Sequence, residues 1–354
     1  MLVRTSLLLT LLGALGCAPP ALVDQDVSLL VPLAQARTFL PATAVVPREL
    51  FDRLHALTVV DEPDALYGAL STVGVRLDAC FTEGTGPQAC RPQVRLVLQP
   101  VFDSPDGLTT RDAAIHVFFS VSEAELLHVV RELSLLRVKQ GLTVGAGLTG
   151  SHPGFDRAAW VSGAEALLRP LLLPERIVRA TSMSVHASNQ AWIFSGVEVT
   201  PGAFTDIVVP TLAPSREGHV TSTGARDTIT ITLDPPSVAE PTLPTVLQAT
   251  ARQQASASEL AAAVDAVLRL QDPAAHNPGT VDCASCHVAA TASWFLQHQA
   301  PLVTVDSPIA AGDVFADSRA LRAFGYFFQQ VALSPRVQRE TGATRLDFAR
   351  RLER

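Results

Sequence analysis

The sequence predicts an α+β fold, in which a strand-rich N-terminal domain is followed by a mostly α-helical C-terminal segment. Short apolar runs, some strictly alternating, recur between residues 94 and 233 and are separated by glycine, proline and serine, as expected for β-strands. After the prolines at 235, 236, 241 and 244, apolar residues instead recur at helical spacing. We therefore assign residues 48–240 to the α+β domain and residues 241–354 to the helical segment.

Strands in the first domain follow from these runs. The predicted strands cover residues 94–98, 115–119, 176–187, 191–200, 205–210 and 228–233. The last of them alternates apolar and polar residues without interruption, which is typical of a strand with one buried face. Between the second and third strands, Ser122 precedes apolar residues at helical spacing that end near Gly141, which predicts a capped helix.

The helical segment is predicted from similar signals. Ser256 and Glu259 have the spacing of a capping box, and an apolar stripe follows as far as Gln271. The next helix is expected to begin at a cysteine-containing motif and to run to about His298. Two more helical stretches are predicted over residues 319–331 and 334–352.

Composition limits the classes of function. Charged residues make up 17% of the 354 residues, and the formal net charge is −7. No dense lysine and arginine block is present to neutralise phosphates, so we expect no nucleic-acid partner.

The N-terminus predicts export. Arg4 is followed by a short apolar stretch, which is typical of a signal peptide over residues 1–16. The segment from Ala14 to Cys17 resembles a bacterial lipobox, which implies that Cys17 is lipidated, although leucine is the usual residue where Ala14 stands. Ordinary signal-peptide cleavage is the alternative. Residues 17–47 are then expected to form a tether. Ala18 favours a lipid-anchored protein of the outer membrane, facing the periplasm or the cell surface.

Two of the five cysteines flank a loop rich in glycine. In an oxidising compartment, a disulfide between Cys80 and Cys90 would close this loop. Two unrelated buried thiols are the alternative.

The remaining cysteines form a motif with a histidine. Cys283 and Cys286 are three positions apart, so their thiols are expected on the same side of one helical turn, and His287 follows directly. This spacing is the signature of covalent c-type haem attachment.

On these residues the chain resembles the c-type cytochromes, over about residues 256–352. The resemblance implies one covalent haem c, thioether bonds to Cys283 and Cys286, and His287 as the proximal iron ligand. It also implies one-electron transfer, or sensing of redox state or a gas, with a redox partner protein, and it favours an electron carrier or binding protein over an enzyme. Trp294 and Phe295 would contact the porphyrin or belong to the core.

The second iron ligand stays open on sequence grounds. Family members often use a methionine downstream of the motif, and none follows Cys286 here. The candidates are Met183, His276 and His298, but on a continuous helix His298 lies about 16 Å along the axis from His287. A five-coordinate iron is a further alternative. The remaining histidines are expected to be mostly structural or surface residues: His55, His116, His128, His152, His186 and His219.

A competing interpretation involves no haem. In a structural or binding lipoprotein, Cys283 and Cys286 would pair in a disulfide or bind zinc together with His276 and His298. Common catalytic motifs of hydrolases, metalloproteases and nucleotide-binding enzymes are absent from the sequence, so an enzymatic role for the first domain is not expected.

Overall fold

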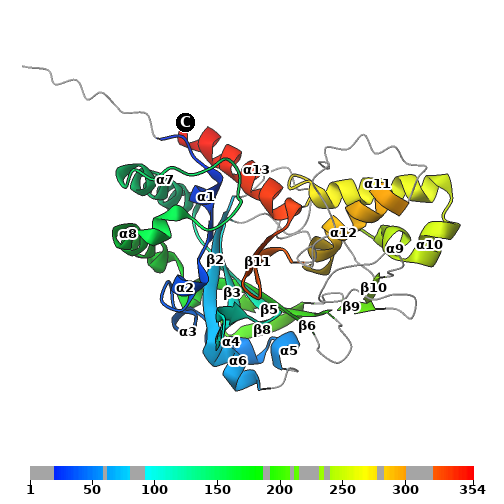
Figure 1. Ribbon diagram of the computed structural model, residues 1–354, viewed down its shortest axis with the longest axis horizontal. Helices are drawn as coiled ribbons and strands as arrows, with labels where there is room; N and C mark the ends of the chain where they lie inside the picture. Colours follow the sequence, from blue (N-terminus) through cyan, green and yellow to red (C-terminus); the bar gives the residue numbers. More distant parts are fainter. Residues whose placement is uncertain are drawn as a thin grey trace, which may run out of the picture.

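A computed structural model describes residues 20–58, 62–79, 92–185, 192–207, 211–214, 231–234, 240–276, 283–299 and 322–354. In these ranges the chain forms a mixed fold of helices around an antiparallel sheet (Figure 1). The predicted α+β class is confirmed.

The strands lie side by side nearly in chain order. They are β1 (Ser28–Leu30), β2 (Leu70–Asp78), β3 (Gln93–Ser104), β5 (Ala113–Ser120), β6 (Ile177–Val185), β7 (Trp192–Thr200), β9 (Thr211–Pro214) and β10 (Ile231–Asp234). Two short strands lie off this path: β4 (Gly107–Thr110) pairs with β3, and β8 (Ala203–Ile207) pairs with β7. All these pairs are antiparallel, so alternate residues of neighbouring strands share a face.

Helices surround this sheet. Before β2 the chain forms α1 (Asp24–Val27), α2 (Leu33–Ala36), α3 (Ala42–Val45), α4 (Arg48–Asp52), α5 (His55–Thr58) and α6 (Pro63–Ala69). Between β5 and β6 lie α7 (Glu123–Lys139), α8 (Ala158–Leu168) and three 3-10 turns over Pro153–Asp156, Arg169–Leu171 and Pro174–Arg176.

The C-terminal elements lie in two places. Helices α9 (Leu243–Leu247), α10 (Ala249–Gln254), α11 (Ala257–Gln271) and α12 (Cys283–Gln299) gather at the right of Figure 1, beside β9 and β10. The chain then forms a hairpin of β11 (Phe324–Phe327) and β12 (Gln330–Leu333), and α13 (Pro335–Leu352) ends beside α1.

Both predicted helix caps are confirmed. The Ser122 hydroxyl accepts a hydrogen bond from the Glu125 amide at 3.2 Å, and the Glu125 carboxylate accepts one from the Ser122 amide at 2.8 Å. The Glu125 carboxylate accepts hydrogen bonds from the Ser122 amide, the Ser122 hydroxyl and Arg176, and these bonds lower its pKa to about 2. Ser256 and Glu259 form the same box at the start of α11. Each box satisfies amide groups that a helix start otherwise leaves without partners.

Residues assigned by sequence to the tether, 17–47, differ from that expectation over their described part. β1 pairs with β2, and Leu30 and Val31 are fully buried. The buried carboxylate of Asp26 in α1 lies 2.9 Å from Nε of Arg137 in α7. These elements are three or four residues long, too short for their apolar residues to show a clear period.

The prediction of a helix over residues 319–331 is wrong for the described residues, because a β-hairpin occupies residues 324–333. Gly325 and Phe328 have positive φ angles of 137° and 55°, which an α-helix does not contain. The Gln99 side chain bonds both backbone groups of Tyr326, accepting at 2.7 Å and donating at 2.9 Å. Contacts with β3, distant in sequence, therefore determine the local structure.

Two hydrophobic cores hold the fold together. The larger one joins the N-terminal elements, most of the sheet, α7, α8 and residues of the hairpin and α13, including Phe324 and Phe348. The smaller one joins α9, α11 and α12 to strand residues Met183, Trp192 and Phe194. Each core therefore contains residues from both sides of the boundary predicted at residue 240, because α9, α11 and α12, as well as the hairpin and α13, pack against the sheet.

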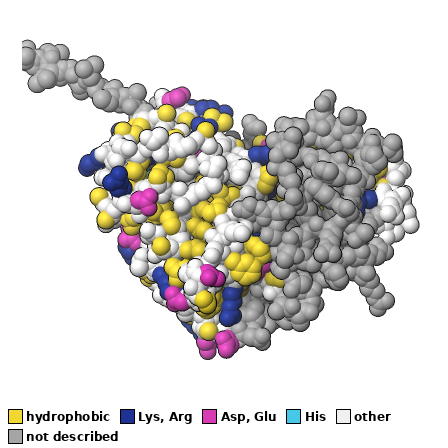
Figure 2. Space-filling model, viewed as in Figure 1, with side chains coloured by type: hydrophobic (Ala, Val, Ile, Leu, Met, Phe, Trp, Pro, Cys, Tyr) yellow, Lys and Arg dark blue, Asp and Glu magenta, His cyan; other side chains and the backbone are white. Residues whose placement is uncertain are grey.

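The surface carries charges of both signs. On the described face shown in Figure 2, acidic and basic side chains are dispersed among hydrophobic and uncharged ones. Among the helices described here, none combines the length and apolar character that crossing a bilayer requires.

Replacement of Gly74 tests how the hairpin packs against the sheet. A Cβ atom at Gly74 would lie 2.0 Å from Cε1 of Phe324, so Gly74→Ala must displace that ring. We expect a loss of about 1–3 kcal/mol in the free energy of unfolding, measured by urea denaturation. Gly68→Ala is the control, because no heavy atom lies within 4 Å of its added Cβ. Equal stability of the two variants would contradict this packing.

Candidate functional site

The site lies on one face of the sheet, here called the inner face, which α12, α13 and the β-hairpin cover. Strand alternation and register place the following residues on it: Gly74, Arg76 and Asp78 of β2, Arg95, Val97 and Gln99 of β3, Ala114, His116 and Phe118 of β5, Thr181 and Met183 of β6, and Trp192, Phe194 and Gly196 of β7. The covering elements are identified by their contacts with this set: His287 of α12, Glu340 of α13 and Tyr326 of β11.

The cysteine-histidine motif begins α12, as predicted. Cys283 and Cys286 are half-buried, and no disulfide joins them. The His287 ring lies against the inner face, with its centroid 5.7 Å from that of Trp192 and 5.3 Å from that of Phe194. The first turn of α12 therefore presents its imidazole to aromatic side chains of β7.

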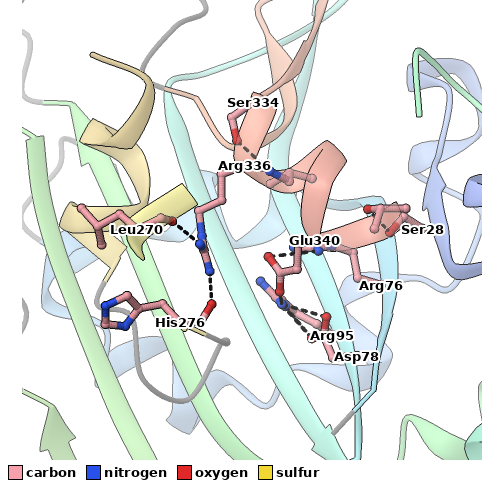
Figure 3. A network of polar contacts seen from close by, with 11 residues as sticks. Ser28, Arg76, Asp78, Arg95, Leu270, His276, Ser334, Arg336 and Glu340 are labelled. Carbon is pink, nitrogen blue, oxygen red and sulfur yellow. Dashed lines mark hydrogen bonds and ion pairs between the residues drawn. The ribbon is translucent and has the colours of Figure 1, made fainter. Parts of the chain in front are cut away.

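A buried network of charges lies on the other half of the inner face (Figure 3). Arg95 lies 2.8 Å from Asp78 and 3.3 Å from Glu340, and Arg76 lies 3.3 Å from the second oxygen of Glu340. Arg76 and Glu340 are only 2% and 3% exposed. Nearby arginines, Arg76 foremost, hold the pKa of the Glu340 carboxyl at about 2 despite its burial. This acid is therefore ionised at neutral pH.

Arg336 extends the network towards the helices. It is 1% exposed, and its guanidinium donates hydrogen bonds to the backbone carbonyls of Leu270 and His276 (Figure 3). These carbonyls lie at the end of α11 and in the segment that follows it. Arg336 thus links α13 to the part of the chain that leads to α12.

The motif and the network interact electrostatically. Burial raises the pKa of the Cys286 thiol above its usual 9.0, and the largest charge effects on it come from Arg336 and Glu340. A thiol with a raised pKa is a poor nucleophile, unlike the activated cysteines of enzymes. This environment suits a cysteine that is held in place, and it does not favour cysteine catalysis.

Among the described residues, the network contains hydrogen-bond donors without partners and more positive than negative charges. The guanidinium groups of Arg76, Arg95 and Arg336 outnumber the carboxylates of Asp78 and Glu340 there. In the described part of the chain, Nε of Arg76, Nε of Arg336 and Nε1 of Trp192 are buried without a hydrogen-bond partner. Buried donors and charge without compensation are unfavourable. A bound group that carries carboxylates would compensate both.

His116 lies at the centre of the inner face. Val97 and Thr181 flank it on the neighbouring strands, and it is half-buried. Burial, followed by repulsion from Arg95 and His287, lowers the pKa of His116 well below its usual 6.5. The imidazole is therefore neutral at pH 7 and lies within electrostatic range of the motif histidine.

The other predicted candidates lie in different places. His276 is turned to Glu240, with its Nε2 atom 2.9 Å from Oε1 of that residue. Met183 lies on the inner face, 6% exposed, in the smaller core. His298 belongs to α12, but its side chain, like those of Trp294 and Phe295, is outside the described part of the structure. So are Cys17, Cys80 and Cys90.

The zinc interpretation requires a cluster of ligands. Within the described ranges, no group of three or more histidine, cysteine, aspartate or glutamate side chains is placed to hold a metal ion.

Sequence reasoning did not place the charged residues and His116 on one covered face of the sheet. The available signal was the interruption of apolar strands by single polar residues: Arg76, Arg95 and His116 each stand between two apolar neighbours. Such a residue on a covered face requires a partner, but the sequence alone does not identify that partner.

Replacement of Glu340 tests the network. Glu340→Gln leaves three buried guanidinium groups facing one carboxylate, and we expect a loss of about 3–5 kcal/mol in the free energy of unfolding at pH 7. Because the folded-state pKa of Glu340 is depressed to about 2, its stabilisation is present above the usual 4.5 and is lost as pH falls from 4.5 towards 2. The gap between wild type and variant should narrow over that range.

Urea denaturation followed by tryptophan fluorescence at several pH values measures this effect. Glu49→Gln is the matched control, since Glu49 is exposed at the start of α4. A Glu340→Gln variant as stable as Glu49→Gln at neutral pH would refute the role given to the network.

Comparisons with known protein families, with curated proteins and with solved structures give no match for this chain.

Proposed function

We propose that this protein carries one covalent haem c and transfers single electrons. The observation that carries the proposal is the arrangement of Cys283, Cys286 and His287, which have haem-attachment spacing in the first turn of α12. Their turn faces a sheet surface that is aromatic on one side and cationic on the other.

The residues have distinct chemical roles in this proposal. Cys283 and Cys286 would hold the porphyrin by thioether bonds, each thiol adding across one vinyl group with its hydrogen going to the second vinyl carbon. No atom leaves, and no external oxidant is consumed. The imidazole of His287 supplies the proximal nitrogen to the iron.

The surroundings of the motif support the fit. Trp192 and Phe194, whose rings contact that of His287, are aromatic residues of the kind that lie against a porphyrin ring. The unused Nε donors of Arg76 and Arg336 suit the two propionates, which are carboxylates. A haem supplies both an apolar macrocycle and two acidic groups, whereas a disulfide supplies neither.

The redox chemistry of a bound haem supports electron transfer as the function. A bound haem iron alternates between the ferrous and ferric states, and the second iron ligand and burial set its potential. The raised pKa of Cys286 argues against thiol catalysis. We therefore propose a carrier that exchanges electrons with a redox partner protein. Sensing of redox state or a gas would use the same haem.

We further propose that the protein is exported and attached by lipid at Cys17. Covalent haem is added outside the cytoplasm, and the signal peptide predicted over residues 1–16 supplies export. Acyl chains on Cys17 would place the folded part at the outer membrane, facing the periplasm or the cell surface.

Haem attachment is tested by expressing the full chain in a bacterium that has periplasmic haem-maturation machinery. We expect a coloured protein with the mass of one added haem and a thioether-type pyridine haemochrome spectrum. Cys283→Ser combined with Cys286→Ser should abolish covalent haem, since no sulfur remains to form the thioethers.

Cys80→Ser combined with Cys90→Ser is the matched control, because it also removes two cysteines but leaves the motif intact. Its covalent haem content per folded protein should equal that of the wild type. A colourless wild-type protein with two unmodified thiols in the motif would refute the proposal.

Lipidation is tested separately. Metabolic labelling with a palmitate analogue should label the wild-type protein, and Cys17→Ser should lose the label and be released from membranes, because the acyl chains require that sulfur. Cys80→Ser serves as the control. Unlabelled wild-type protein that is cleaved elsewhere would show ordinary signal-peptide processing instead.

A further inference from the structure

We propose that a cleft between the tips of two β-hairpins binds a neutral carbohydrate, with one sugar ring lying against Phe328. The hairpins are formed by β3 with β4 and by β11 with β12. No residue of the cysteine-histidine motif or of the buried charge network lines this cleft. Carbohydrate binding here does not depend on whether the motif carries haem.

Hydrogen bonds join the two hairpin tips, which enclose a cavity of about 330 Å³. The Gln329 side chain donates to the Asp106 carbonyl at 3.1 Å, and the Phe328 carbonyl accepts from the Thr110 amide at 3.1 Å and from its hydroxyl at 3.0 Å. The volume lies at the lower end of the range for small-molecule sites, about 300–1,000 Å³. The cavity is lined from one hairpin by Ser104, Asp106 and Thr109, and from the other by Phe327, Phe328, Gln329 and Gln330.

Phe328 occupies a position where folding alone does not favour a large apolar side chain. It begins the two-residue turn between β11 and β12, and its φ of 55° lies in the left-handed region, where glycine or asparagine is preferred. Phe328 is also 51% exposed. Strained backbone positions are concentrated at functional sites. A ligand that covers this ring would account for a side chain that both strains the turn and contacts water.

The Phe328 ring is held in place before any ligand arrives. Its centroid lies 4.5 Å from that of Phe327, which is buried. The guanidinium of Arg322 lies over the Phe327 ring at 3.6 Å, and Asp112 accepts a hydrogen bond from Arg322. Together with the bonds from Thr110, these contacts give a rigid aromatic surface, and a ligand that binds it orders few additional groups.

The rest of the lining favours a neutral ligand with several hydroxyl groups. Within the described part of the chain, the side chains of Asp106, Thr109 and Gln330 have no hydrogen-bond or ion-pair partner. Hydroxyl and amide groups both donate and accept hydrogen bonds, and a carboxylate accepts them, as sugar hydroxyls require. A sugar ring presents apolar C–H groups on its face and hydroxyls at its rim, so it matches the ring of Phe328 and the polar side chains at once.

The charge of the lining excludes the commonest anionic ligands. Among the residues that line the cavity, none is a lysine or an arginine, and Asp106 is acidic. A phosphate or an acidic sugar would therefore meet a like charge and no compensating cation. A wholly apolar ligand would instead leave the polar side chains without partners.

The test presents the purified full-length protein to a glycan array that carries neutral and anionic saccharides. Calorimetric titration with the neutral saccharide that binds best then compares variants. Phe328→Asn removes the ring but suits the left-handed backbone, so affinity should fall about tenfold or more while the midpoint of urea unfolding stays equal or rises. Phe328→Tyr keeps the ring and should bind like the wild type. Leu346→Ala is the matched control, because Leu346 is 52% exposed on α13, outside the cleft.

Binding of a neutral saccharide that is lost in Phe328→Asn and retained in Leu346→Ala would confirm the site. Failure to bind any neutral saccharide, or binding of anionic saccharides alone, would overturn it, as would unchanged affinity in Phe328→Asn. If Phe328→Asn does not fold, Asp106→Asn decides, because Asp106 is exposed. That variant should bind about fivefold or more weakly at unchanged stability, and an unchanged affinity would overturn the site.

Discussion

The buried charges of Arg76, Arg95, Asp78 and Glu340 constrain the structure more than any other interaction. Glu340 comes from α13, near the C-terminus, and the other three come from β2 and β3. Removal of one partner from such a group leaves an uncompensated charge in a medium that solvates it poorly. The network therefore fixes the C-terminal helix to the sheet at one position, with an accuracy that apolar contacts alone do not provide.

The position of the motif depends on that attachment. Arg336 lies one helical turn before Glu340 on α13, and it binds the carbonyls of Leu270 and His276. Those carbonyls lie at the end of α11 and in the segment after it, and α11 packs against α12 in the smaller core. A displacement of Glu340 would thus reach Cys286 by two routes, through its own charge and through the segment that Arg336 holds.

Local signals in the sequence predicted the elements that local chemistry determines. Ser122 and Ser256 begin helices because each hydroxyl and the glutamate three residues later satisfy the first amides of the same helix. The hairpin could not be predicted in this way. Gln99 of β3 bonds the backbone of Tyr326, and the ring of Phe324 packs against Gly74 of β2, so contacts distant in sequence determine it. For the site, spacing identified Cys283, Cys286 and His287, but the pairing that brings Arg76 and His116 to the same face exists only in the folded sheet.

The inner face is divided in a manner that favours one kind of ligand. Its aromatic part, with Trp192 and Phe194, lies at one end of the sheet's central strands, and its cationic part, with Arg76 and Arg95, lies at the other, with His116 between them. A single metal ion would use neither part, because aromatic rings and guanidinium groups are not its ligands. A planar group that is apolar along one edge and anionic along another would contact both. That division, together with two thiols and an imidazole on the facing helix, is the ground on which we propose a haem and not a disulfide or a zinc ion.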